Sequence, residues 1–459
     1  MGTVVVIGGG PAGYVAAITA ARNGQQVTLI ESQQLGGTCL NEGCIPTKSL
    51  LKSAETYETI RHATAFGIDV AEGAVSVNWP GVQQHKDSVM KQLVLGVGYL
   101  MKKNKVQVVR GKAAFVTDRE VWVEKPEGDE QITADRFIIA TGSAPIELPF
   151  APFDGSWILH SGQAMSLPDI PASMLVVGGG VIGCEFASIY SRLGTKVTIV
   201  ELADHLLPGE DRDIAEVLAK QLTAAGVAVY TGTALKSVQA ATKTATVQAK
   251  DRIEEIQAER VLVAIGRRPR VEELGLDRIG VRYSRQGIEV NEHMQTNVPH
   301  IYACGDVIGG VQLAHVAFHE GEVAALHACG RGKSVSYRAV PRCIYTSPEI
   351  ASVGLTEAQA REQYGDVRIG EFAFSANGKA LIGKEPAGKV KVIVEPTYHE
   401  IVGMSIVGPR ATEMIGQGTL MLHAEMTTDA MEDLIAAHPT LSEAVTEAVA
   451  NATGRAIHG

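Results

Sequence analysis

Several features that would set the chain apart from ordinary globular proteins are missing from its sequence. Nowhere do about 18 apolar residues follow one another, which argues against a membrane-spanning helix. The apolar start TVVVIGGG lacks the basic flank of a secretory signal. No low-complexity tract occurs, and 45% hydrophobic against 20% charged residues favours folded domains over disorder. We therefore expect a folded protein of the cytoplasm.

Cysteine is also scarce. Six cysteines in 459 residues are too few for a disulfide-stapled scaffold of this length. Only Cys39 and Cys44 are neighbours in sequence, and the chain continues for 116 residues after Cys343, the last of them. In a reducing compartment, a close pair is more often catalytic or metal-binding than structural.

Positive charge is in deficit. The formal net charge of −10 argues against a nucleic-acid partner and is compatible with a basic protein partner. A chain of 459 residues also exceeds the size at which one hydrophobic core stops growing, so we expect several packed domains.

One pattern occurs twice. Residues 3–31 give a strand TVVVI, a turn GGGPAG, a helix and a second strand QVTLIE. Residues 175–201 repeat this order in LVVGGGVIGCEFASIYSRLGTKVTIVE, and in each copy 23 residues separate the first glycine from the terminal acid. The matching positions are Gly8, Gly10, Gly13 and Glu31 in the first copy and Gly178, Gly180, Gly183 and Glu201 in the second.

Dinucleotide binding requires this pattern. The first glycine permits a tight turn, the second lets a pyrophosphate approach the backbone, and the third lets helix and strand pack closely. The acid accepts hydrogen bonds from a ribose. A lone G-x-G-x-x-G is weak evidence, but two complete copies leave little room for a purely structural turn. Glu201 would repel a 2′-phosphate and no cation follows in Leu202, Ala203 or Asp204, so the second copy favours NAD over NADP.

Three further segments read as strands that end at such an edge. RFIIATGS ends near Gly142 and RVLVAIGRRP near Gly266, and IYACGDVIGG places Asp306 after a short apolar strand. Ligands of doubly wound folds lie at the carboxyl ends of strands. For Asp306 an ordinary turn is an equally good interpretation.

The cysteine pair follows the first copy directly, in LGGTCLNEGCIPTKSLL, at the head of a helical stretch that runs towards Ile60. On a regular helix, residues five apart lie roughly 8–9 Å apart at Cα, too far for a disulfide. The first turn must therefore be distorted if the pair is bonded, and Gly43 permits this. A helix N-terminus lowers a thiol pKa, whereas Glu42 opposes that effect.

Other interpretations of the pair are weaker. Four intervening residues and no nearby histidine do not match a zinc site, so we expect no metal. Two unrelated buried cysteines is the other alternative. A dithiol exchanges electrons with a nicotinamide only through a mediator such as a flavin. We therefore assign FAD to the first copy, beside the cysteines, and NAD to the second.

With GGTCLNEGCIPTKSLL, both glycine turns, ACGD and the C-terminal AAHPTLSEA in view, the chain resembles the pyridine nucleotide-disulfide oxidoreductases, and among them the dihydrolipoamide dehydrogenases. The resemblance covers essentially the whole length. It implies FAD-dependent oxidation of protein-bound dihydrolipoamide with reduction of NAD⁺, as the E3 component of 2-oxo acid dehydrogenase complexes. Glu42, Thr47 and Ala436 depart from the family's common pattern, which puts redox potential and pH optimum in doubt.

The resemblance also implies residue roles. Cys39 matches the thiol that meets the substrate, Cys44 the thiol that forms a charge-transfer complex with FAD, and Lys48 the lysine near the flavin, paired with Glu185. His438 matches the acid/base, oriented by Glu443 and acting on the other subunit of a homodimer. From the sequence alone, a structural histidine and a Thr440–Glu443 capping box explain these two equally well. Further implied FAD contacts are Gly37, Thr38, Gly111, Thr141, Gly142, Ser143, Asp306 and the run Gln312, Leu313, Ala314 and His315, and Gly266 is an implied NAD contact.

Two competing functions stay open. Glutathione reductase shares the cysteine and His-Pro-Thr motifs, but its NADP preference conflicts with Glu201. A non-catalytic flavoprotein subunit is disfavoured by the intact set of Cys39, Cys44, Lys48 and His438. Mercuric reductases and large thioredoxin reductases need cysteines near the C-terminus, which this chain lacks.

The fold class expected is therefore α/β, with two Rossmann-like domains and a C-terminal α+β dimerisation domain. We expect an FAD-binding domain over residues 1–145, an NAD-binding domain over 146–268, a return to the FAD domain over 269–338 and a dimerisation domain over 339–459. VKVIVEP and IVGMSIVG should form antiparallel strands of the last domain. The expected partners are a lipoyl-bearing acyltransferase or a glycine-cleavage H protein, with no nucleic acid and no membrane.

Overall fold

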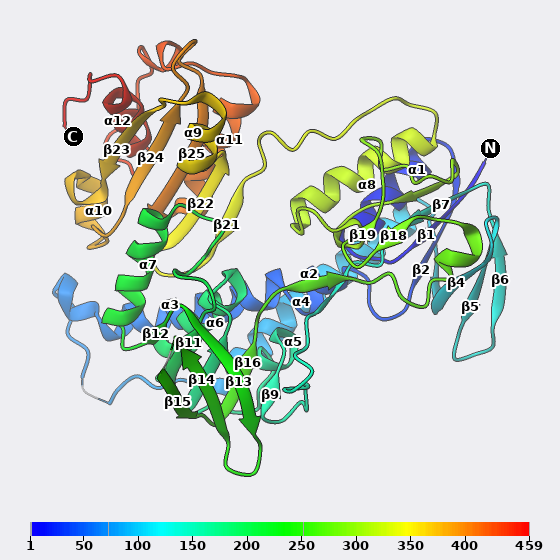
Figure 1. Ribbon diagram of the computed structural model, residues 1–459, viewed down its shortest axis with the longest axis horizontal. Coiled ribbons are helices and arrows are strands. Elements are labelled where there is room, and N and C mark those ends of the chain that lie inside the picture. The colour runs from blue at the N-terminus through cyan, green and yellow to red at the C-terminus, as the bar shows by residue number, and fades with distance from the viewer. Residues whose placement is uncertain (1, 72, 251, 459) are drawn as a thin grey trace.

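The computed structural model describes residues 2–71, 73–250 and 252–458. Figure 1 shows three units: the first carries the N-terminus, the second lies below it, and the third carries the C-terminus at the opposite side. Each unit is built on its own five-stranded sheet. The α/β architecture with an antiparallel C-terminal unit is the one that the sequence predicts.

The first sheet is parallel and has the strand order β20-β7-β1-β2-β3. Its central strands are short apolar runs because both faces are covered. On one face, helices α1 and α8 pack closely, and a Cβ on Gly321 of α8 would lie only 2.3 Å from the carbonyl oxygen of Ala12. The elements are β1 (Thr3–Ile7), α1 (Pro11–Arg22), β2 (Gln26–Glu31), α2 (Gly37–Asn41), α3 (Cys44–Arg61), α4 (Trp79–Lys103), β3 (Gln107–Arg110), β7 (Arg136–Ile139), β20 (Ile301–Ala303), η3 (Asp306–Ile308) and α8 (Ala314–Ala328).

The second sheet is also parallel, with the order β12-β11-β10-β16-β9. Each parallel sheet is accompanied by a three-stranded antiparallel sheet, β4-β5-β6 in the first unit and β13-β14-β15 in the second. The elements are β9 (Ile158–Leu159), α5 (Ser161–Ala164), β10 (Ser173–Val177), α6 (Val181–Arg192), β11 (Lys196–Val200), α7 (Arg212–Ala224), β12 (Ala228–Tyr230) and β16 (Arg260–Val263), with β4 (Lys112–Thr117), β5 (Glu120–Glu124), β6 (Glu130–Thr133), β13 (Thr233–Gln239), β14 (Thr244–Ala249) and β15 (Arg252–Gln257).

Two short strands lie where the chain passes between the first two units. β8 (Ser143–Pro145) leaves the first unit and pairs antiparallel with β17 (Arg267–Pro269), which returns to it. This side-by-side crossing supports the limits near 145 and 268 that the sequence suggested. We propose 1–145, 146–268, 269–338 and 339–459 as the domain limits.

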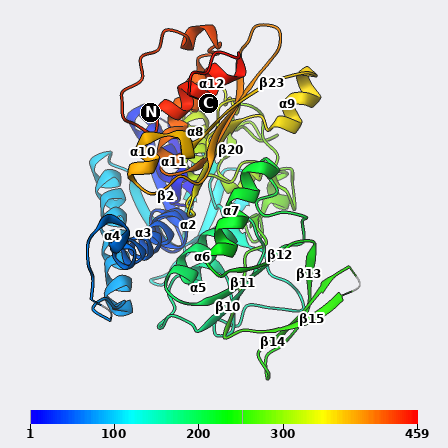
Figure 2. The same cartoon turned by 90° about the vertical axis from the view of Figure 1, so that its left-hand side faces the viewer.

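The third unit has an antiparallel sheet with the order β21-β22-β25-β24-β23. The predicted strands VKVIVEP and IVGMSIVG are β24 and β25 and pair antiparallel as expected. Figure 2 shows α10, α11 and α12 gathered at this end of the molecule. The elements are β21 (Arg342–Ile344), β22 (Glu349–Gly354), α9 (Glu357–Tyr364), β23 (Arg368–Ala373), α10 (Gly378–Ile382), β24 (Lys389–Val394), β25 (Ile401–Gly408), α11 (Ala411–His423) and α12 (Glu443–Ala452), with the short elements η1 (Ala63–Phe66), η2 (Leu276–Ile279), β18 (Tyr283–Ser284), β19 (Gly287–Ile288), η4 (Phe374–Ala376) and η5 (Asp429–Met431) elsewhere in the chain.

Among the described residues, the helices are all too short or too polar to cross a lipid bilayer.

Candidate redox and dinucleotide site

One cavity of about 1960 Å³ joins the first two units. Both glycine turns lie on its wall, through Gly8 and Gly10 on one side and Gly178 and Gly180 on the other. The cysteine pair, Cys39 and Cys44, lines the same cavity. The cavity therefore brings together the two motifs that the sequence treats separately.

The first glycine turn has the geometry that dinucleotide binding requires. Gly8 has φ of +106°, and a Cβ on Gly13 would lie 1.8 Å from the carbonyl oxygen of Gly8. Around Gly10 the nearest atom that a Cβ would meet is 3.8 Å away, so this glycine borders open space at the start of α1. The Glu31 carboxylate accepts hydrogen bonds from the backbone N–H of Gly9 at 2.6 Å and of Gln33 at 2.7 Å.

The second turn repeats this geometry. Gly178 has φ of +106°, a Cβ on Gly183 would lie 1.9 Å from the Gly178 carbonyl oxygen, and a Cβ on Gly180 would meet nothing within 4 Å. Glu201 accepts from the backbone N–H of Gly179 at 2.5 Å and of Ala203 at 2.6 Å. Each carboxylate has further lone pairs, so it can bind the turn and still accept from a ribose hydroxyl.

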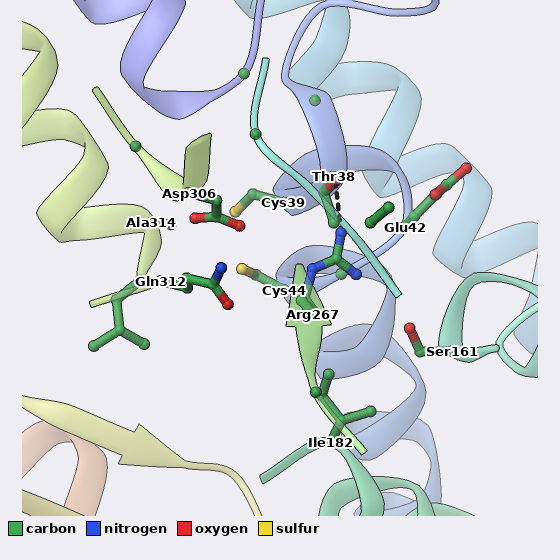
Figure 3. A pocket seen from close by; sticks show the side chains of 18 of the residues that line it. Thr38, Cys39, Glu42, Cys44, Ser161, Ile182, Arg267, Asp306, Gln312 and Ala314 are labelled. Carbon is green, nitrogen blue, oxygen red and sulfur yellow. Dashed lines mark hydrogen bonds between the residues drawn. The ribbon is translucent and has the colours of Figure 1, made fainter. Parts of the chain in front are cut away.

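The cysteine segment is not one regular helix. Cys39 lies in the short helix α2, whereas Cys44 is the first residue of α3, so the chain leaves the helical path between them. Gly43 stands at the break, where a Cβ would lie 3.0 Å from the Thr38 carbonyl oxygen. Both cysteines are free thiols, and both side chains point to the side of the cavity where Asp306 and Gln312 lie (Figure 3).

The two thiols have different acidities. A side-chain hydrogen bond between them raises the pKa of Cys39, and burial adds to this rise. The same hydrogen bond lowers the pKa of Cys44 to about 7, and the positive charge of Lys48 also lowers it. Cys44 is therefore the more acidic thiol of the pair.

Lys48 and Glu185 form an ion pair next to Cys44. The Nζ atom of Lys48 lies 2.8 and 2.9 Å from the two carboxylate oxygens of Glu185, a residue whose side chain is only 4% exposed. The backbone N–H of Tyr345 donates to the same carboxylate at 3.0 Å, and Lys48 lies 4.5 Å above the Tyr345 ring centroid. Lys48, the lysine predicted to lie near a flavin, is therefore held by Glu185 of the second unit and by the ring of Tyr345, which directly follows β21.

Asp306 belongs to a hydrogen-bonded cluster on the wall of the cavity, close to Cys39 (Figure 3). It accepts a hydrogen bond from the Ser143 hydroxyl, which in turn accepts from Nε of Arg267 at 2.8 Å. Arg267 also donates to the Ser143 carbonyl oxygen at 2.9 Å and reaches the Thr38 hydroxyl at 3.4 Å (Figure 3). Asp306 is the first residue of the short helix η3 and also lines the cavity, so it stands in a turn at the cavity wall.

His438 and Glu443 lie in the third unit and do not line this cavity. Nδ1 of His438 is 2.8 Å from a Glu443 carboxylate oxygen, and the His438 side chain is 78% exposed. The other Glu443 oxygen accepts from the Thr440 backbone N–H at 2.7 Å, which forms one arm of the predicted capping box. The second arm is absent, because α12 begins at Glu443 with Ser442 as its N-cap, so Thr440 is not the capping residue. The Thr440 hydroxyl donates to the Ala437 carbonyl oxygen. Hydrogen bonds from Thr440 and His438 lower the pKa of Glu443.

Most residues predicted for the site share this cavity. Five predicted residues do not line it. Gly13 and Gly183 pack against the first glycine of their own turns, and Ser143 donates to Asp306. His438 and Glu443 lie in the third unit. The predicted residues that line the cavity are Gly8, Gly10, Glu31, Gly37, Thr38, Cys39, Cys44, Lys48, Gly111, Thr141, Gly142, Gly178, Gly180, Glu185, Glu201, Gly266, Asp306, Gln312, Leu313, Ala314 and His315.

Two residues of the site were not predicted from the sequence. Arg267 immediately follows Gly266, at the end of the predicted strand RVLVAIGRRP, so its position carried a usable signal. Tyr345 lies 160 residues from Glu185 in the chain and had no local signal. Within the described part of the chain, His, Cys, Asp and Glu side chains form no cluster of three that could hold a metal.

Comparisons with known proteins agree with this geometry. The family model for pyridine nucleotide-disulphide oxidoreductases matches residues 2–321, and the model for the dimerisation domain of the same family matches residues 340–449. A dihydrolipoyl dehydrogenase of Bacillus subtilis is 57% identical over 456 residues, 99% of this chain and 100% of the relative. A dihydrolipoyl dehydrogenase of Geobacillus stearothermophilus is 42% identical over 457 residues, 99% of this chain and 97% of the relative.

Solved structures give the same match. LpdA from Mycobacterium tuberculosis superposes with a TM-score of 0.89 at 29% identity, covering 98% of this chain and 99% of that one. The HOCl-induced flavoprotein disulfide reductase RclA from Escherichia coli superposes with a TM-score of 0.86 at 28% identity, with coverage of 98% and 99%.

Proposed function

Since the chain belongs to the pyridine nucleotide-disulphide oxidoreductase family and groups there with the dihydrolipoyl dehydrogenases, we propose that it oxidises protein-bound dihydrolipoamide and reduces NAD⁺. The chain is an oxidoreductase of a family whose cofactors are FAD and NAD. The observation that carries the proposal is the position of Cys39 and Cys44 on the wall of a cavity that both glycine turns also line.

The first-unit half of the cavity fits FAD. The open space at Gly10 and the start of α1 suit a pyrophosphate, and Glu31 suits a ribose. Asp306, on the cavity wall next to Ser143 and Arg267, is suited to hydroxyl groups of the ribityl chain. When bound, FAD supplies a two-electron acceptor for the dithiol and a hydride donor for NAD⁺.

The second-unit half fits NAD better than NADP. Glu201 lies at the end of β11 with its carboxylate on the cavity wall, where a 2′-phosphate would be repelled. Arg212 is the first arginine or lysine after Glu201 in the chain, but it pairs with Asp204 and Glu216. Its charge is therefore already balanced by two carboxylates.

The thiol chemistry follows from the two acidities. In the oxidised pair, a substrate thiolate attacks Sγ of Cys39, the Cys39–Cys44 bond breaks, and Cys44 leaves as a thiolate beside Lys48. The second substrate thiol then displaces Cys39 and closes the substrate disulfide. Two electrons pass to the cysteine pair, and two thiol protons pass to bases. The low pKa of Cys44, about 7, makes it the better leaving group.

His438 is the proposed base for the substrate thiols. Its exposed imidazole does not line the cavity of its own chain, and Glu443 holds it through Nδ1, which leaves Nε2 free for the proton. The match to the dimerisation domain supports a homodimer. We propose that His438 of one subunit serves the cysteine pair of the other.

A lipoyl-bearing acyltransferase of a 2-oxo acid complex or a glycine-cleavage H protein would deliver the substrate. The net charge of −10 suits a basic binding segment on such a partner. A cytoplasmic location is part of the proposal, because a free dithiol needs a reducing compartment.

Steady-state assays with the purified flavoprotein test the proposal. We expect turnover of NADH with lipoamide and little turnover of NADPH with oxidised glutathione. Preference for NADPH and glutathione would replace the proposed function with a glutathione reductase activity. A protein that binds FAD but turns over neither substrate would indicate a non-catalytic subunit.

A further inference from the structure

The loop between β11 and α7 is bound to the second glycine turn. It lines the cavity with Leu202, Pro208 and Glu210. The backbone N–H of Leu207 donates to the Gly179 carbonyl oxygen at 2.9 Å. Leu207 holds φ of +52°, in the left-handed region that a branched side chain rarely adopts. Such a conformation persists only where the surroundings impose it.

At its other end, the loop is bound to the third unit by an ion pair whose carboxylate is buried. Oε1 of Glu210 accepts from Nε of Arg342, on β21, at 3.0 Å, and the Glu210 side chain is only 6% exposed. Its second oxygen, Oε2, is buried and has no hydrogen-bond partner among the residues that the structure describes. A buried carboxylate in this state depends strongly on its one charged neighbour.

Asp211 and Asp213, which follow Glu210, also contact the third unit. Asp211 accepts from the backbone N–H of Glu357, the first residue of α9, at 3.0 Å. Nζ of Lys391, a lysine of β24 whose side chain is 4% exposed, lies 3.2 Å from Asp211, 3.2 Å from Asp213 and 2.6 Å from Glu357. The start of α7 therefore lies against the third unit (Figure 1).

These contacts form a closed series that starts and ends at the second glycine turn, along the second-unit half of the cavity. Three residues beyond Arg342, the Tyr345 N–H donates to Glu185 of α6. Helix α6 itself begins at the second glycine turn. The path therefore runs from that turn through Leu207, Glu210 and Arg342 and returns to it through α6.

From this closed series of contacts we infer that Glu210 and Arg342 are positioning residues for the pyridine nucleotide, which hold the loop 202–210 in the shape that binds it. The inference rests on the proposed assignment of NAD to the second unit. Neither residue belongs to the cysteine chemistry. Their loss should therefore affect nucleotide affinity without affecting the exchange between lipoamide and the cysteine pair.

The test uses the FAD-loaded dimer and the variants Glu210→Gln, Arg342→Gln and both together. Calorimetric titration of the oxidised enzyme with NAD⁺ should show affinity reduced about fivefold or more in each single variant. The double variant should lose no more than the singles, because both break the same contact. FAD content and the rate at which dihydrolipoamide reduces the enzyme should stay at the wild-type level.

Arg212→Gln is the matched control, because Arg212 lies in the same stretch of charges but is half-exposed and pairs with Asp204 and Glu216. Its NAD⁺ affinity should stay within about twofold of wild type, as for surface changes in general. Should a single variant fold poorly, the exchange of Glu210→Arg with Arg342→Glu rebuilds the pair and should recover affinity.

Unchanged NAD⁺ affinity in both single variants would overturn the inference. So would a loss of affinity that only accompanies loss of FAD and a lower melting temperature, because that pattern indicates general unfolding. A wild-type enzyme that binds no NAD⁺ is a different outcome, and it would overturn the proposed function itself.

Discussion

In the first and second units, the acid at the end of the second strand binds the glycine turn in the same way. Glu31 accepts from Gly9 at 2.6 Å, and Glu201 accepts from Gly179 at 2.5 Å. In each turn, a Cβ on the third glycine would lie less than 2 Å from the carbonyl oxygen of the first glycine. The two turns are therefore equivalent in backbone and in packing.

The equivalence continues a few residues further and then ends. In the first unit the N–H of Gly36 donates to the Gly9 carbonyl oxygen at 2.8 Å, and in the second the N–H of Leu207 donates to that of Gly179 at 2.9 Å. Both residues have positive φ, +94° and +52°. After Gly36 the chain continues into α2, which carries Cys39. After Leu207 it continues to Glu210, which forms the ion pair with Arg342 of the third unit.

This comparison shows where the chemistry of each unit comes from. The shared turn supplies a phosphate-binding backbone and nothing that distinguishes a flavin from a nicotinamide. The residues that follow it place a redox-active pair next to one turn and a charged interdomain contact next to the other. Variants that affect one unit and spare the other therefore test the comparison directly.

The largest effect should come from Cys44→Ser. Removing the thiol leaves Cys39 without its bonding partner, so we expect lipoamide turnover to fall at least about a thousandfold. FAD content should stay at the wild-type level, because Cys44 is not needed for the pyrophosphate or ribose contacts. Anaerobic titration with NADH and steady-state kcat measure both properties.

Cys329→Ser is the control for that change, because Cys329 lies at the end of α8 and outside the cavity. It should keep full activity. Lipoamide turnover by Cys44→Ser close to that of the control would contradict the role of the first unit.

The next effect in size is that of His438→Ala, with a loss of about a hundredfold in kcat with dihydrolipoamide, the usual scale for a general base. Reduction of an artificial dye by NADH needs no thiol proton transfer, so its rate should be unchanged. The variant thus separates chemistry at the cysteine pair from chemistry at the second unit. An equal loss in both assays would argue for a structural His438.

These predictions differ in how far the sequence supported them. Both glycine turns and the break at Gly43 involve residues close together in the chain, so local patterns were enough to predict them. The contact of His438 with Glu443 is also local, but only the family resemblance implied it. The Glu443 arm of the capping box formed as predicted, but the Thr440 arm did not, because α12 begins at Glu443 with Ser442 at its N-cap. The local pattern does not fix the residue at which the helix begins.

Contacts between distant segments could not be predicted from local patterns. Lys48 and Glu185 are 137 residues apart, and only the family resemblance paired them. Glu210 and Arg342 are 132 residues apart and had no such support. Each looks like an ordinary surface charge in the sequence, because burial follows from how the units pack and not from neighbouring residues.

A smaller effect should distinguish the two third glycines. In Gly183→Ala the added Cβ would meet the Gly178 carbonyl oxygen at 1.9 Å, and in Gly13→Ala it would meet that of Gly8 at 1.8 Å. Overpacking of about 1–3 kcal/mol should weaken ligand binding at the affected turn roughly tenfold or more. Gly183→Ala should lose NAD⁺ affinity and keep FAD, and Gly13→Ala should lose FAD.

FAD absorbance and NAD⁺ titration measure these outcomes, with Gly98→Ala as control, since a Cβ there meets nothing within 4 Å. Loss of FAD from Gly183→Ala alone would reverse the assignment of the two units.

The smallest effect concerns the two acids. Glutamine at position 201 keeps the shape of the side chain and removes the charge that repels a 2′-phosphate, so discrimination between NAD⁺ and NADP⁺ should fall about tenfold, or roughly 1.4 kcal/mol. The ratio of kcat/KM for the two nucleotides measures this. Glu31→Gln is the matched control, because it makes the same change at the equivalent backbone position and should leave the ratio unchanged. Both acids accept from equivalent backbone N–H groups, those of Gly9 and Gly179, so a difference between the two variants reports the identity of the bound dinucleotide. Equal changes in the ratio would therefore show that the second unit is not the one that selects the nicotinamide nucleotide.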